Sequence, residues 1–244
     1  GMTFVMDWGH LLGRIHAPGL KSKGVSIDVC SMIDRYLSLD GALGAELQQA
    51  MTPAEAVELL KDGLRRSTSG ETSTRNRTAL LSDAAGGQYP YAAVLSCIDS
   101  RAPVEQIFDA ASGDLFVARV AGNVASPDLT ASLEYATKYA GSKAILVLGH
   151  TRCGAVKGAW AGLEDGHLTG LLGRIQPAVN ETKSEVGAED SAENLDRCSQ
   201  VNVRKTMAAL RSDSSILAGL EAEGKIAIIG GVYDVATGEV AWLD

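Results

Sequence analysis

Two short apolar runs, each closed by a cysteine or a histidine, constrain the fold of this chain more than any other feature of its sequence. The runs are Ala92–Cys97 and Lys143–His150. Short, nearly continuous apolar stretches that end in polar residues are typical of strands buried on both faces of a parallel sheet. Ligands and metals collect outside the carboxyl ends of such strands, so the sequence predicts that Cys97 and His150 meet at one edge of a sheet.

The residues that end these two strands supply the side chains of a metal site. The first strand leads into Cys97-Ile-Asp-Ser-Arg101, and the second leads into His150-Thr-Arg-Cys153. Two thiolates and an imidazole suit Zn²⁺ in a catalytic site, where three protein atoms hold the metal and a fourth position stays open. The sequence therefore predicts a catalytic zinc site formed by Cys97, His150 and Cys153.

The remaining thiols and imidazoles have no partner at ligand spacing. Cys30 and Cys198 each stand without a second cysteine or a histidine nearby, so we expect both to be packed thiols. His10, His16 and His167 are likewise isolated and are expected at the surface.

The pattern along the chain predicts an α/β fold with one large domain. Further strands are expected at 114–119 and 225–232. Thr52-Pro53-Ala54-Glu55 combines a cap, a proline in the first turn and a capping-box glutamate, which predicts the start of an amphipathic helix. The segment 67–78 is rich in Ser, Thr, Gly and Arg and is predicted to be an exposed connector. Other helices are expected at 26–38, 42–50, 128–140, 153–163 and 191–210.

Composition excludes several classes of partner. The 244 residues are 45% hydrophobic and carry a net charge of −8, with no run of Lys or Arg longer than a pair. This balance argues against a nucleic-acid surface and against docking on anionic lipid. No apolar run approaches the roughly eighteen residues of a membrane span. Four cysteines, two of them required as thiolates, favour a reducing compartment, so we expect a cytoplasmic protein.

The two ligand motifs resemble those of the β-class carbonic anhydrases. The resemblance is carried by Cys97-x-Asp99-x-Arg101 and by His150-x-x-Cys153-Gly154, and it extends from about Met51 to the end of the chain. Three further segments are similar to the region after the family's second strand, to its following helix and to its C-terminal hairpin. These segments are Arg119–Asn123, Ser132–Ala136 and Gly231–Gly238.

The resemblance implies a mostly parallel central sheet, with four parallel strands and a C-terminal antiparallel edge strand, flanked by helices. Residues 51–244 are then expected to form a single zinc domain. Residues 1–50 have no counterpart in the short bacterial members of the family. We expect them to form a helical extension that packs on the core or on a partner subunit, because two short helices bury too little surface to fold alone.

The resemblance also implies an activity, which is the reversible hydration of carbon dioxide to bicarbonate by a zinc lyase. Cys97, His150 and Cys153 would hold the zinc ion, whose bound hydroxide attacks carbon dioxide. Asp99 and Arg101 would form a dyad beside the metal, in which Arg101 keeps Asp99 ionised and turned away from the zinc. If that pair breaks, Asp99 can become a fourth ligand and close the site.

The substrate pocket implied by the resemblance involves Gln88, Phe116, Tyr135 and Gly154. In the family the first three typically come from the neighbouring subunit, so we expect a homodimer or a higher homo-oligomer. Members that close reversibly at lower pH tend to carry a tryptophan three residues before the first zinc cysteine, where this chain has Val94. The sequence therefore predicts a site that rests open.

Three alternatives remain open from the sequence. A hydrolase of carbonyl sulfide or carbon disulfide would use the same hydroxide on a substrate analogous to carbon dioxide. A non-catalytic zinc or bicarbonate-binding homologue is also compatible with the fold, although it would not need Asp99 and Arg101. A redox protein could use Cys97 and Cys153, but no Cys-x-x-Cys motif supports that reading.

Overall fold

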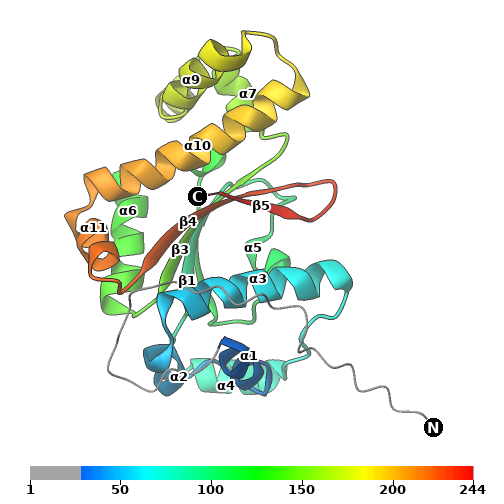
Figure 1. Ribbon diagram of the computed structural model, residues 1–244, viewed down its shortest axis with the longest axis vertical. Helices are drawn as coiled ribbons and strands as arrows, with labels where there is room; N and C mark the ends of the chain where they lie inside the picture. Colours follow the sequence, from blue (N-terminus) through cyan, green and yellow to red (C-terminus); the bar gives the residue numbers. More distant parts are fainter. Residues whose placement is uncertain (1–28, 244) are drawn as a thin grey trace.

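A five-stranded sheet forms the centre of the computed structural model, which describes residues 29–243 (Figure 1). The strand order is β2-β1-β3-β4-β5; β1 to β4 are parallel, and β5 runs antiparallel to β4. The predicted fold class is therefore confirmed. The strands are β1 (Ala92–Ser96), β2 (Leu115–Arg119), β3 (Ala144–His150), β4 (Ala227–Tyr233) and β5 (Val240–Leu243).

The two central strands are buried along their whole length, as their apolar runs predict. Val94 of β1 lies in register with Leu146 of β3, and Leu95 lies in register with Val147. Successive side chains of a strand point to opposite faces of the sheet, so the first pair contributes to one hydrophobic core and the second pair to another. Continuous apolar sequence is thus required because both faces of the sheet are covered by helices.

The helices divide between the two faces of the sheet and its carboxyl end (Figure 1). The first core includes residues of α1 (Val29–Leu37), α2 (Ala45–Ala50), α3 (Pro53–Ser69) and α5 (Val104–Ile107), and α4 (Arg77–Ala84) lies beside α1 and α2. The second core uses α6 (Pro127–Glu134), α10 (Ala192–Asp213) and α11 (Ser215–Ala222). Beyond the strand ends lie η2 (Ala121–Asn123), α7 (Gly154–Trp160), α8 (Gly166–Gly173) and α9 (Gln176–Val186).

Helix α3 begins where its capping signals predict. The Thr52 hydroxyl accepts a hydrogen bond from the Glu55 backbone N–H at 3.3 Å, and the Glu55 carboxylate accepts one from the Thr52 backbone N–H at 2.7 Å. Pro53 occupies the first turn, where a missing N–H has no cost. The reciprocal pair satisfies two backbone donors that would otherwise lack partners at the start of the helix.

In the first described helix, α1, the thiol that was expected to be packed lies at the surface. Met32 and Tyr36 of α1 are buried, whereas Cys30 is exposed and Leu37 is 40% exposed. The expectation of a packed thiol at Cys30 is therefore wrong. Met32 and Tyr36 are one turn apart and enter the first core together, which turns Cys30 outward. His10 and His16 lie outside the described residues.

The segment 67–78 is largely the exposed connector that its composition predicts, since nine of its twelve residues are exposed and none is buried, but helices overlap both of its ends. Helix α3 continues to Ser69, and α4 begins at Arg77. Between them, the side chain of Arg75 is only 3% exposed and pairs with the carboxylate of Asp114 at 3.0 Å. Local composition does not reveal this one buried side chain, because the partner of the arginine lies 39 residues further along the chain.

Several other boundaries differ from the sequence-based expectation. The helix predicted over 128–140 is α-helical only to Glu134 and continues as a π-helical segment, η3 (Tyr135–Tyr139). Helices α4, α5, α8, α9 and α11 were not predicted. Among the described residues, no helix is long and apolar enough to cross a membrane.

Candidate metal centre

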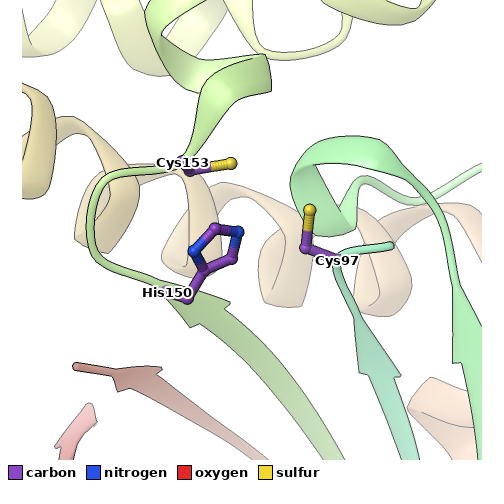
Figure 2. Close-up of side chains that lie close together, drawn as sticks. All are labelled: Cys97, His150 and Cys153. Carbon is purple, nitrogen blue, oxygen red and sulfur yellow. The ribbon is translucent and has the colours of Figure 1, made fainter. Parts of the chain in front are cut away.

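Cys97, His150 and Cys153 converge at the carboxyl ends of β1 and β3 (Figure 2). Their ligand atoms all lie within 4.8 Å of one another, and all three side chains are buried. Strands β1 and β3 are parallel neighbours, so Cys97 and His150 leave the sheet at the same edge. Cys153 follows from the turn after β3, at the position that precedes α7.

The imidazole of His150 is set to offer a nitrogen lone pair to a metal. Its Nδ1 lies 2.8 Å from the Thr151 carbonyl oxygen, so Nδ1 carries the proton and donates it to that oxygen. The other nitrogen, Nε2, is buried and has no hydrogen-bond partner among residues 29–243. An unpaired buried nitrogen facing two sulfurs fits a soft divalent cation such as Zn²⁺.

The two thiols are electrostatically coupled. The pKa of Cys97 is lowered to about 4, first because it accepts a hydrogen bond from the Cys153 thiol and further through contacts with His150 and with the Gly122 N–H, 3.3 Å from its sulfur. The same contact, together with burial, raises the pKa of Cys153. Cys97 is therefore the more readily ionised of the two thiols, and binding of a divalent cation would require both as thiolates.

Asp99 and Arg101 form an ion pair beside the three ligands. Arg101 donates to the two carboxylate oxygens from Nε at 3.0 Å and from Nη2 at 2.8 Å, and its backbone N–H donates at 2.9 Å. The side-chain contact is the main reason that the pKa of Asp99 lies below its usual range. Asp99 Oδ2 is also 3.7 Å from His150 Nε2, so an ionised carboxylate faces the cluster. The arginine Nη2 further contacts the carbonyl oxygen of Arg152 at 3.2 Å.

Several residues outside the predicted site hold the ligand loops in place. Arg119, at the end of β2, donates to the carbonyl oxygens of Cys97 at 2.8 Å and Asp99 at 2.6 Å. Asp196 and Asn202 of α10 bind the backbones of two other loops at the site. Only Arg119 had a signal in the sequence, namely its place at the end of a predicted strand.

Three of the predicted pocket residues lie away from this chain's own ligands, whereas the fourth, Gly154, directly follows Cys153. Phe116 pairs with Ala93 in the sheet, about 13 Å along β1 from Cys97. Its ring meets that of Tyr135, with centroids 6.3 Å apart, and both rings line an apolar surface cavity of about 500 Å³ between β2 and α6. Gln88 is exposed in the loop before β1, and Gly154 is exposed at the start of α7.

Two of the isolated residues lie where the sequence predicts, unlike Cys30. His167 is exposed on α8, and Cys198 is fully buried on α10. Burial raises the pKa of the Cys198 thiol. These two predictions are confirmed.

Comparison with known proteins gives consistent matches. Residues 92–240 match the family model described as carbonic anhydrase. "Carbonic anhydrase 2" of Mycobacterium tuberculosis is 36% identical over 199 residues, covering 79% of this chain and 93% of that protein. The carbonic anhydrase of Mycolicibacterium smegmatis is 34% identical over 197 residues, covering 77% of this chain and 92% of that protein.

Solved structures match at the level of the fold. One of the tetrameric β-carbonic anhydrases of Sordaria macrospora superposes with a TM-score of 0.64 at 28% identity, covering 68% of this chain and 87% of that chain. The Coccomyxa β-carbonic anhydrase, solved in complex with acetazolamide, has a TM-score of 0.61 at 30% identity and covers 66% of this chain and 75% of that chain.

Proposed function

The chain belongs to the β-class carbonic anhydrase family, and on that basis we propose that it interconverts carbon dioxide and bicarbonate at a zinc ion held by Cys97, His150 and Cys153. One observation carries the proposal: a buried cluster of two sulfurs and an unpaired imidazole nitrogen lies beside a formed carboxylate–guanidinium pair. Two sulfurs and an imidazole nitrogen suit zinc. In the proposed reaction, the carboxylate–guanidinium pair would orient solvent beside the metal.

When bound, zinc lowers the pKa of water so that hydroxide is available near neutral pH to attack carbon dioxide. The chain's own residues orient that chemistry. Asp99, kept ionised by Arg101, is an acceptor only, so it fixes the direction of a solvent hydrogen and leaves a lone pair for the substrate. Arg101 also holds the carboxylate through two hydrogen bonds, which would keep it from becoming a fourth metal ligand.

We further propose that Gln88, Phe116 and Tyr135 complete the pocket of a neighbouring subunit, while Gly154 lies beside the substrate of its own. The separation of Phe116 from Cys97 along the sheet, and the open apolar cavity that it shares with Tyr135, support this assignment. The protein would then act as a homodimer or as a higher assembly of dimers.

Residues 51–244 would form the zinc domain, with residues 1–50 as an extension that packs on a core. The described part of the extension supports the chain's own core as its place, because α1 and α2 contribute buried residues to the first core. These residues are Met32, Tyr36, Leu43 and Leu47. Free ligand thiols also favour a reducing compartment such as the cytoplasm.

Stopped-flow measurement of carbon dioxide hydration, on protein of known metal content, tests the function. We expect about one zinc per chain, and Cys153→Ala should lose both the zinc and the activity. Cys198→Ala is the matched control, since it removes a buried thiol outside the cluster and should retain both. Full zinc content in Cys153→Ala, or turnover of carbonyl sulfide without hydration of carbon dioxide, would contradict the proposal.

A further inference from the structure

Helix α10 brings polar side chains to two backbone segments at the metal centre, which are the turn between His150 and Cys153 and the η2 segment that contacts Cys97. The helix is 22 residues long and packs on β3 and β4, with its N-terminal half beside α7 and η2 at the carboxyl end of the sheet (Figure 1). Its Val203 lies so close to β3 that a Cβ atom added at Gly149 would be 2.7 Å from a valine methyl group. The helix is thus fixed against the strand that ends in His150.

Asn202 binds the backbone of the η2 segment, which contacts Cys97. Its side chain is 1% exposed, and Nδ2 donates to the Gly122 carbonyl oxygen at 2.7 Å. Gly122 has a left-handed backbone (φ +72°), and a Cβ atom there would lie 2.5 Å from Ile175 Cδ1. In this conformation the Gly122 N–H donates to the Cys97 sulfur at 3.3 Å. The bond to Asn202 therefore helps to aim a hydrogen-bond donor at a ligand atom.

Asp196 binds the backbone of the turn between His150 and Cys153. Its Oδ1 accepts a hydrogen bond from the Arg152 backbone N–H at 2.8 Å. Arg152 has a φ of +56°, a conformation that residues with a Cβ rarely adopt, so the turn needs support from its surroundings. The carbonyl oxygen of Arg152 accepts from Arg101, so the same turn also positions the dyad.

We propose that Asp196 and Asn202 are positioning residues of the metal centre, which α10 uses to hold Cys97 and the His150–Cys153 turn in register. The two residues are six positions apart on one helix, about 9 Å along its axis. One rigid element therefore fixes the positions of both the His150–Cys153 turn and the Gly122 loop relative to each other. The inference rests on the proposed zinc site. Hydrogen bonds of this kind orient ligands and slow the loss of metal.

The test compares variants of α10 by the rate at which a strong chelator removes zinc, and by the thiolate-to-metal absorption of the cobalt-loaded protein. Asp196→Ala and Asn202→Leu should each release zinc about 10- to 100-fold faster than the wild type and should shift the cobalt absorption. Asp196→Asn keeps an acceptor oxygen for the Arg152 N–H and should remain close to the wild type. If Asn202→Leu does not fold, Asn202→Asp removes the same donor with less change of shape.

Ser199→Ala is the matched control for general destabilisation. Ser199 is buried on the same helix between the two positions, but its hydroxyl donates only to the Leu195 carbonyl oxygen of α10 itself, at 3.1 Å. It should lower the melting temperature of the metal-free protein without changing zinc release. Wild-type release rates in Asp196→Ala and Asn202→Leu, or equally fast release in Ser199→Ala, would overturn the positioning role alone. A wild-type protein that binds neither zinc nor cobalt would overturn the metal centre as well.

Discussion

Arg101 contributes to the site rather than to the fold. Its side chain is 49% exposed, and its partner Asp99 is 17% exposed, so water screens much of their attraction. Exposed ion pairs of this kind add little to stability. The geometry is nevertheless bidentate, with a further contact to the turn that carries Cys153. A pair with little effect on stability and a fixed orientation beside the ligands is expected to serve the reaction.

Arg101→Ala should therefore lower kcat/KM by about tenfold to a hundredfold, while the protein keeps its zinc. Without the guanidinium, the Asp99 carboxylate is free to turn toward the metal ligands. Stopped-flow kinetics and metal analysis on one preparation would measure both effects. Arg65→Ala, which removes a 60% exposed arginine that pairs with Asp62 on α3, should change neither. Loss of zinc in parallel with activity in Arg101→Ala would assign the arginine a structural role instead.

Helix α3 contains a glycine whose value lies in packing and not in backbone freedom. Gly63 is in the middle of the helix and is buried where α3 meets the residues after α5. A Cβ atom at this position would overlap the Phe108 carbonyl oxygen and lie 2.8 Å from its carbon. The absence of a side chain lets the helix approach the backbone of its neighbour.

Gly63→Ala should consequently destabilise the protein by about 1–3 kcal/mol, as overpacked substitutions do. Helix propensity alone predicts a gain of about 1 kcal/mol, so the sign of the change tells which effect dominates. Chemical denaturation would measure it. Gly219→Ala in α11 is the control, since no atom lies within 4 Å of the added carbon, and it should be neutral or stabilising. A gain of stability in Gly63→Ala would refute the packing argument.

The elements that could be predicted from the sequence are those with a strong local signal. Buried strands such as β1 and β3 need continuous apolar runs, and α3 carries its start signals within four residues. The helices that were missed have weak patterns: α8 reads Gly-His-Leu-Thr-Gly-Leu-Leu-Gly, and α4 buries only Leu80. Such helices are stabilised by tertiary contacts, which a local pattern does not contain.

The same division holds for the candidate site. The ligands could be predicted because their residue types at strand ends carry the chemistry themselves. Asn202 could not be identified, because a polar residue on a long amphipathic helix is usually on its exposed side, and the carbonyl group that it binds is 80 residues earlier in the sequence. The burial of the Arg75 side chain could not be predicted for the corresponding reason, since its buried partner Asp114 is distant in sequence.

At the scale of the whole molecule, aromatic side chains form an exposed face over β2 and η3. Tyr135 and Tyr139 are 55% and 71% exposed, and their rings stack with centroids 6.2 Å apart. Phe116 continues this apolar surface on the edge strand β2. If these residues complete a neighbour's pocket, activity requires assembly.

Dilution should therefore reduce activity and assembly together, as measured by sedimentation velocity and by kinetics over the same concentration range. Tyr139→Glu places a charge on this face and should shift the protein toward an inactive monomer. Leu81→Glu is the control, because Leu81 is 57% exposed on α4, away from this face, and should leave the assembly unchanged. A fully active monomer would contradict the shared pocket.

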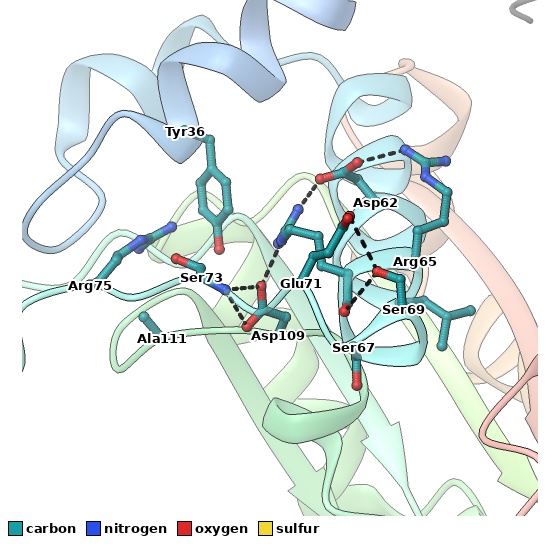
Figure 3. A network of polar contacts seen from close by, with 12 residues as sticks. Tyr36, Asp62, Arg65, Ser67, Ser69, Glu71, Ser73, Arg75, Asp109 and Ala111 are labelled. Atoms are coloured by element: carbon teal, nitrogen blue, oxygen red, sulfur yellow. Dashed lines mark hydrogen bonds and ion pairs between the residues drawn. The ribbon is translucent and has the colours of Figure 1, made fainter. Parts of the chain in front are cut away.

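Buried polar contacts join α1 to the residue before β2, and Tyr36 and Arg75 lie beside the polar network around Asp109 in Figure 3. The hydroxyl of Tyr36 donates to the Asp114 carboxylate at 2.7 Å, and the guanidinium of Arg75 lies 4.1 Å from the centre of the tyrosine ring. Nearby, Asp109 accepts from the Ser73 backbone N–H at 2.9 Å and fixes the same connector. Three segments distant in sequence thus depend on one set of contacts.

This network makes stability sensitive to alkaline pH. Burial, followed by the proximity of Tyr91 and of the Asp114 carboxylate, raises the pKa of Tyr36 well above its ordinary value of 10.0. Since the folded-state pKa lies above that of the unfolded chain, the stabilising contribution is complete below about pH 10 and is lost as the pH rises toward the folded-state value. Tyr36→Phe should cost about 1–2 kcal/mol at neutral pH through the lost hydrogen bond. Above pH 10 its difference from the wild type should shrink by up to about 1.4 kcal/mol per pH unit. Urea denaturation between about pH 7 and pH 11 would measure both curves. Thr52→Ala, expected to cost about 1 kcal/mol without removing a phenol, should remain parallel to the wild type throughout. If the curve of Tyr36→Phe is also parallel to that of the wild type, the ionisation of Tyr36 does not cause the loss of stability at alkaline pH.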